Sequence, residues 1–138
     1  MSYEEILFSL GINTDLPEWK RAKTQLYINL DIDVEKLEFI GGKAVKFTQR
    51  SIRGEVEIGE REGVAFIYSG GLLIVCTAAD DMPLTVLIAR KLIRVVEAET
   101  KLLKACVIVK TNDDVYELKV PKKQVSELEK MINKVRSK

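Results

Sequence analysis

The stretch from Gly63 to Lys104 constrains the fold more than any other part of this 138-residue chain. It begins with two apolar runs, residues 63–69 and 72–78, on either side of a Gly70-Gly71 pair. Runs of this kind around a turn signal predict two neighbouring strands that are buried on both faces. A helix can cover one face of this hairpin. The other face needs a second cover, which could be the N-terminal helices, another subunit or a ligand.

Residues 82–104 admit two interpretations. Frequent β-branched residues favour a strand. However, polar residues recur at spacings of four, three, four and three, with an apolar stripe opposite them, and this periodicity favours an amphipathic helix. Asp80 and Asp81 would cap such a helix and Pro83 would occupy its first turn. We therefore predict one long helix, whose polar face comprises Arg90, Arg94, Glu97, Lys101 and Lys104 and whose apolar face comprises Leu84, Leu87, Ile88, Leu92, Val95, Val96 and Leu102.

The remaining patterns predict an α+β fold, in which a curved antiparallel sheet of five to seven strands is backed by the long helix and a C-terminal helix. The apolar stripe of the C-terminal helix is Val125, Leu128, Ile132 and Val135. Upstream of the hairpin, we expect helices at 3–10 and 16–23, a half-buried strand at 24–32 and a short helix at 33–40. Residues 43–53 should be irregular or extended, and residues 54–60 should form a strand with Val56 and Ile58 inward. Downstream, we expect a hairpin of residues 105–111 and 115–120 and the final helix from Pro121.

The composition argues against strong electrostatic binding of nucleic acid or membrane, because 22 Lys and Arg nearly balance 21 Asp and Glu. The chain has no histidine, no C-x-x-C pair, no nucleophile elbow and no phosphate-binding glycine loop. We therefore expect no enzymatic activity, no metal and no cofactor. Cys76 and Cys106 lie in apolar runs, which predicts buried, reduced thiols, and a disulfide between them is not needed.

No stretch approaches the roughly 18 apolar residues of a membrane span, and the N-terminus is acidic. We expect a cytoplasmic protein that makes no contact with membranes.

Through the motifs AFIYSGG, VCTA and ARKLIRVV, the chain at residues 63–97 resembles the TATA-box-binding protein (TBP) family. Residues 65–71, AFIYSGG, are similar to the family's A-L-I-F-S-S-G, and residues 75–78, VCTA, to its V-C-T-G-A. Residues 89–96, ARKLIRVV, are similar to its helix motif A-R-K-Y-A-R-I-I. The length of 138 residues predicts a single domain over residues 1–138. Within it, the resemblance implies that residues 24–104 form one TBP-like repeat, with a helical extension at 1–23 and a hairpin plus helix at 105–138.

The same resemblance implies a binding surface on the open face of the sheet. This predicted face consists of Phe66, Tyr68, Leu73, Val75 and Thr77 and is bordered by Tyr27 and Asn29. A basic rim of Lys43, Lys46, Arg50 and Arg53 would surround it. In the family this face enters the DNA minor groove. Glu55 and Glu57 depart from the family, which has apolar and basic residues on this strand. Their carboxylates would repel the phosphates of DNA.

The leading hypothesis is a homodimeric binding module that contacts DNA or a transcription-type partner, and the second is an adaptor that binds only protein. Two other folds also fit the order of elements. If residues 82–99 were extended, many strands plus a C-terminal helix would resemble a pleckstrin-homology (PH)-like module. A roadblock/longin-like module shares the order hairpin, long helix, hairpin, helix.

Overall fold

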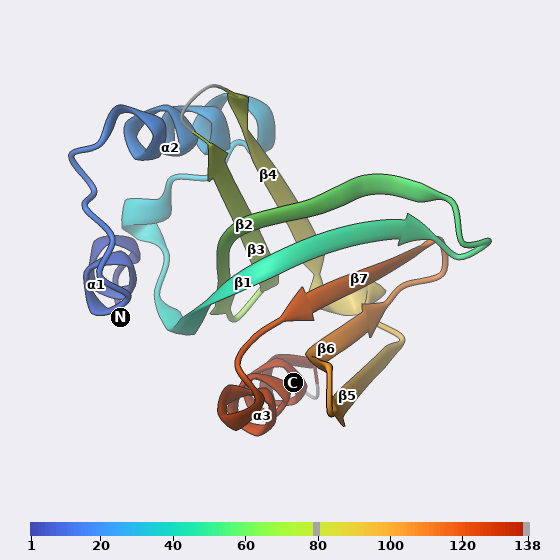
Figure 1. Cartoon of the computed structure of the whole chain (residues 1–138). Helices are drawn as coiled ribbons and strands as arrows, with labels where there is room; N and C mark the ends of the chain where they lie inside the picture. The colour runs from blue at the N-terminus through green and yellow to red at the C-terminus, as the bar shows by residue number, and fades with distance from the viewer. Residues whose placement is uncertain (79–80, 137–138) are drawn as a thin grey trace.

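The computed structural model describes residues 1–78 and 81–136, and its centre is a single antiparallel sheet. The sheet contains seven strands in the order β4-β3-β2-β1-β7-β6-β5, so β4 and β5 form its two edges. Figure 1 shows these strands and the α-helices around them. The strands are β1 (Phe39–Ser51), β2 (Val56–Tyr68), β3 (Gly71–Ala78), β4 (Asp81–Ala89), β5 (Val95–Lys101), β6 (Lys104–Lys110) and β7 (Asp114–Lys119).

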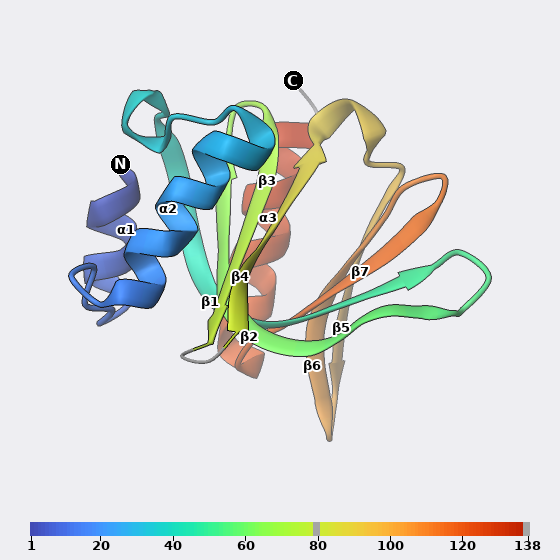
Figure 2. The ribbon, with the colours of Figure 1, turned by 90° about the horizontal axis from the view of Figure 1, so that it is seen from above.

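The helices lie on opposite faces of the sheet. α1 (Tyr3–Ser9) and α2 (Pro17–Leu30) lie on one side of β1–β4, and α3 (Val125–Arg136) lies on the other, as Figure 2 shows. The predicted α+β class, with a curved antiparallel sheet and a C-terminal helix, is therefore confirmed. The described residues also contain short 3-10 turns: η1 (Val34–Lys36), η2 (Arg90–Leu92) and η3 (Lys122–Gln124).

Each face of the sheet has its own apolar core. The inner core lies between the two halves of the sheet and α3, and it includes Phe47, Ile67, Ile74 and Leu118. The four predicted stripe residues of α3 are all buried in it, so that helix is confirmed: Val125, Leu128, Ile132 and Val135.

The outer core lies between α1, α2 and the β1–β4 part of the sheet. The Tyr3 ring stacks on Phe66 with 4.7 Å between ring centroids, and Trp19 and Leu26 of α2 are buried beside them. Of the three covers considered for the second face of the central hairpin, the N-terminal helices are the one observed.

Both predicted hairpins are present. β2 pairs with β3 from Gly63↔Cys76 to Tyr68↔Gly71, and β6 pairs with β7. Gly71 has a φ of 139°, where an L side chain is strained, so the turn requires the glycine found there.

The long helix predicted for residues 82–104 is wrong. This segment forms β4, η2 and β5, and residues 102–103 are a turn, so the extended interpretation of residues 82–99 is the one observed. β4 pairs with β3, and β5 pairs with β6. Asp81 begins β4 instead of capping a helix, and Asp80 lies outside the described residues.

The polar residues predicted a helix because a spacing of four residues is compatible with one face of a helix and with one face of a strand. Glu97 and Lys101 are four residues apart, which places them on one face of a strand as well as on one side of a helix. In β4, Leu84, Val86 and Ile88 pack on the inner core at every second position. The ladders to β3 and β6 satisfy the backbone groups of both strands, so tertiary pairing overrides a local helical spacing.

The strand predicted for residues 24–32 is also wrong, because α2 continues to Leu30. Its buried residues, Trp19, Ala22 and Leu26, are spaced by three and four, as on one side of a helix. Neither Gly nor Pro interrupts residues 18–30, so a helix that starts at Pro17 can propagate through them.

Two smaller expectations are corrected in the segment that follows α2. The short helix predicted for residues 33–40 is only the turn η1, and β1 begins at Phe39. Val56 is 67% exposed instead of pointing inward, because the far end of the β1–β2 hairpin projects beyond the core, as Figure 1 shows. Of the two conformations considered for residues 43–53, the extended one is observed as far as Ser51, where β1 ends.

Candidate functional site

The apolar centre of the predicted binding face is not available to a partner. Phe66, Leu73 and Val75 each have no exposed surface, because α1 and α2 pack directly on them in the outer core. This part of the prediction is wrong for a physical reason: an apolar strand face signals a contact, but it does not say whether the contact is internal.

The other residues of the predicted face divide between two surface depressions. Tyr68 and Tyr27 line a cavity of about 440 Å³ at the end of α2, together with Asp31 and Asp33. The Tyr68 ring lies over Gly70, where an added Cβ would come within 2.6 Å of it. Thr77 instead lines the larger groove described below, and Asn29 is exposed on α2 and donates a hydrogen bond to Gln25.

The predicted basic rim does not form one surface. Lys43 forms an ion pair with Glu127 of α3 at 2.7 Å, which places it on the inner face of the sheet. Lys46 and Arg50 lie on the opposite face of β1, since side chains alternate along a strand. Arg50 is paired with the buried Glu117 at 2.9 Å, and Arg53 is exposed in the β1–β2 turn.

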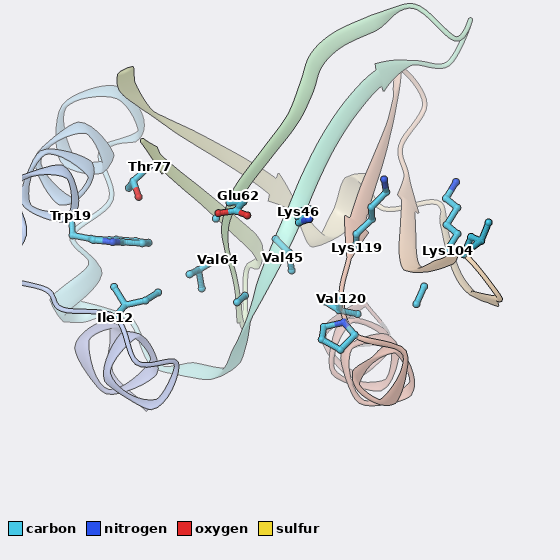
Figure 3. A pocket seen from close by; sticks show the side chains of 15 residues that line it. Ile12, Trp19, Val45, Lys46, Glu62, Val64, Thr77, Lys104, Lys119 and Val120 are labelled. Atoms are coloured by element: carbon cyan, nitrogen blue, oxygen red, sulfur yellow. The ribbon is translucent and has the colours of Figure 1, made fainter. Parts of the chain in front are cut away.

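A groove lies on the outer face of the sheet, between the N-terminal helices α1 and α2 and the β5–β6 hairpin. It has a volume of about 670 Å³, within the usual range for ligand sites. Figure 3 shows Trp19 and Ile12 on one side of it and Lys104, Lys119 and Val120 on the other. The full lining is Ile12, Trp19, Ala44, Val45, Lys46, Glu62, Gly63, Val64, Thr77, Leu103, Lys104, Ala105, Lys119, Val120 and Pro121.

A row of charged residues crosses the floor of the groove. Lys46 on β1 lies directly opposite Glu62 on β2 and, on its other side, directly opposite Lys119 on β7. Like charges in directly opposed positions destabilise a sheet. Lys119 turns away to Glu60, with 2.8 Å between the amino nitrogen and a carboxylate oxygen. The hydrogen bond from Lys119 lowers the pKa of Glu60, and the same bond raises the pKa of Lys119.

Lys104 is also paired with carboxylates beyond the groove. The Lys104 amino nitrogen lies 3.3 Å from a carboxylate oxygen of Glu117 and 3.7 Å from one of Glu99. Three lysines and one glutamate therefore line the groove, and two of the lysines are already paired with acids outside it. Among the described residues Lys46 has no ion pair within 4 Å, but it lies opposite Glu62 in the sheet and its charge helps to lower the pKa of Glu60.

The walls of the groove are apolar. On one side, Ile12 follows α1 and Trp19 lies on α2. On the other side, Leu103 lies in the turn between β5 and β6. Leu102 and Leu103 are each 97% exposed in a two-residue turn, where polar residues or glycine are usual. Trp19 is also part of the outer core, where it is 8% exposed.

Sequence reasoning missed the groove as a unit. Its lining comes from segments more than a hundred residues apart, and the ends of those segments carry no recognisable motif. The Leu102-Leu103 pair was the one available signal, but the predicted helix placed Leu102 in an apolar stripe.

In residues 1–78 and 81–136, no group of three or more His, Cys, Asp and Glu side chains is placed to hold a metal ion. Within the same part of the chain, no helix combines the length and apolar character that crossing a membrane requires.

Comparison with known proteins gives a likeness of fold. No protein-family model and no curated protein matches this sequence. Among solved structures, the chain is similar to a chain of "Vav1 inhibited by an allosteric inhibitor: Vav1 inhibitors block GEF activity", with a TM-score of 0.59 and 13% sequence identity. The similarity covers 96% of this chain but 36% of the Vav1 chain. At this identity it concerns the fold alone.

Proposed function

We propose that this protein is a non-catalytic interaction module with a PH-like fold, and that its groove binds an extended segment of a protein partner. The PH-like assignment is supported by the extended conformation of residues 82–99 and by the single α-helix that follows the last strand. Function does not follow from a fold, so the proposal depends on the groove.

The exposed Leu103 carries this proposal. A leucine with 97% of its surface in water borders a groove whose opposite wall is also apolar. Apolar surface placed in this way is typical of a contact site for another chain. The position of Lys46 between the two walls favours a partner segment with an acidic side chain flanked by apolar ones.

Two adjacent leucines provide a matched test of the groove. Leu102 and Leu103 have the same exposure, but only Leu103 lines the groove. Peptides would be selected from a random displayed library on the wild-type protein and then titrated against Leu102→Ser and Leu103→Ser. Burial of one leucine contributes about 1.5–3 kcal/mol, so Leu103→Ser should weaken binding about tenfold or more. Leu102→Ser should bind like wild type, and the selected peptides should carry an acidic residue.

Two results would contradict the proposal: failure to enrich any peptide, or equal affinity of the selected peptides for both variants. DNA binding stays a prediction with its own test, a gel shift with an AT-rich duplex at low salt. A shift that weakens steeply with added salt would favour DNA. Under the protein-partner proposal, we expect no shift from the wild type or from Tyr68→Ala.

A further inference from the structure

β4 is an edge strand whose outer side is unpaired. It stands at the end of the strand order and pairs only with β3 among the described strands. Natural proteins protect such edges with charged side chains, especially lysine, or with proline. Residues 82–89, MPLTVLIA, contain no charge, and Pro83 is their single protective residue. Over most of its length the edge therefore has no charged side chain that would oppose another strand, and α2 packs against β4 on the outer face of the sheet.

The direction of each backbone group follows from one hydrogen bond. The Arg90 N–H donates to the Gly70 carbonyl at 2.9 Å, immediately beyond the pair Gly71↔Ala89. In an antiparallel ladder, alternate residues direct both backbone groups to the same neighbour. Leu84, Val86 and Ile88 therefore face β3. The residues that direct their N–H and C=O groups to the free edge are Pro83, Thr85, Leu87 and Ala89.

Proline at this edge restricts how a second strand can pair. Pro83 has no N–H to donate, so only Thr85, Leu87 and Ala89 offer both a donor and an acceptor. Pairing of two identical strands about a two-fold axis at Leu87 would join Leu87 to its copy and Thr85 to the copy of Ala89. This register uses all three residues. An axis at Thr85 would oppose Pro83 to Leu87 and lose a hydrogen bond on each side of the axis.

The side chains at this edge suit a second copy of the same chain. Thr85 and Leu87 lie opposite Val75 and Leu73, so they project on the outer face of the sheet. Leu87 is 37% exposed and would contact its own copy, while the smaller Thr85 and Ala89 would face each other. No charged residue of one strand would oppose a like charge of the other. A contact of this kind is isologous and closes as a dimer.

We infer that the protein forms a symmetric dimer by antiparallel pairing of two β4 strands, with the two-fold axis at Leu87. About six backbone hydrogen bonds would form, two for each of the three opposed pairs. The sheets of the two copies would join into one. This inference does not rest on the groove, whose lining includes Thr77 of β3 but no residue of β4.

Two lysine substitutions in the same strand test this interface. Leu87→Lys places like charges directly opposite each other at the axis, which should raise the dissociation constant of the dimer about tenfold or more. Met82→Lys adds the same charge at a more exposed position, 66% against 37%, beyond Pro83 and outside the paired register. Sedimentation equilibrium over a range of concentrations should show a dimer for the wild type and Met82→Lys, and a monomer for Leu87→Lys.

Hydrogen exchange of the wild-type backbone amides gives a second measurement that does not depend on the variants folding. The amides of Thr85, Leu87 and Ala89 should become protected as the protein concentration rises, while those of Val86 and Ile88 should be protected at every concentration. If the wild-type protein were monomeric at all concentrations, the inference would be wrong, and a partner for the β4 edge would have to be a different protein. Equal dissociation of both lysine variants would also overturn it, as would rapid exchange at Thr85 and Leu87 in a dimer.

Discussion

Burial at single positions sets the chemistry of the two thiols. Cys76 has no exposed surface, lies in β3 opposite Gly63 and belongs to the inner core. This burial raises its pKa from about 9 to about 11, because a thiolate is poorly solvated in the core. Cys106 is also buried and its pKa is also raised, chiefly by desolvation. Both cysteines are free, so the expectation of buried, reduced thiols is confirmed for them.

We predict that Cys76 in the native protein reacts at least a hundredfold more slowly with a thiol reagent at pH 8 than in the unfolded chain. The rise in pKa, from about 9 to about 11, lowers the thiolate fraction about a hundredfold, and burial blocks access to the sulfur in addition. Cys106→Ser would leave Cys76 as the single thiol for labelling with iodoacetamide. The same variant unfolded in urea provides the control, and comparable rates in the two conditions would contradict the prediction.

At the scale of elements, α2 shows how two spacings can compete within one sequence. Leu26 and Ile28 are two residues apart, as on one face of a strand, but Leu26 has no exposed surface and Ile28 is 66% exposed. Only a helix that packs along one side gives this difference. The two residues therefore distinguish the observed helix from the predicted strand.

We predict that Leu26→Ala lowers the free energy of unfolding by about 2–5 kcal/mol, the usual effect of removing a buried leucine side chain. Ile28→Ala should change it by about 0.5 kcal/mol or less, since exposed substitutions have small effects. Urea denaturation of the two variants and the wild type measures both values. Equal destabilisation by the two substitutions would instead favour the strand.

At the scale of the whole molecule, a single sheet supports two apolar layers. The outer layer contains Trp19, the one tryptophan of the chain, and the inner layer contains Ile132 of α3. Phe66 and Ile67 are neighbours in β2, yet they belong to different layers because they project from opposite faces. Loss of the sheet would therefore remove the support of both layers.

We predict that the two layers unfold together. Trp19 fluorescence reports on the outer layer and far-UV circular dichroism reports on the sheet, and their urea transitions should coincide. Ile132→Ala, which removes packing only from the inner layer, should shift both transitions equally by about 2–5 kcal/mol. If residues 1–23 behaved as a separate extension, the fluorescence transition would come first and would not respond to Ile132→Ala.

Several elements could be predicted from the sequence because their signals are local. The Gly70-Gly71 turn, the hairpin of β6 and β7 and the stripe of α3 depend on neighbouring residues, and each was predicted in the correct place. The class of the fold followed from these elements. The buried character of Cys76 and Cys106 followed from the apolar runs around them.

Tertiary structure decided the rest, because backbone pairing and burial involve residues far apart in the chain. Residues 82–101 became two strands because β3 and β6 were available to pair with them. Phe66, Leu73 and Val75 became core because α1 and α2 fold back over them. The sequence alone determined which residues are apolar and where turns interrupt them, and the packing of distant segments determined which apolar residues remain at the surface, among them Leu103 at the groove and Leu87 at the edge of the sheet.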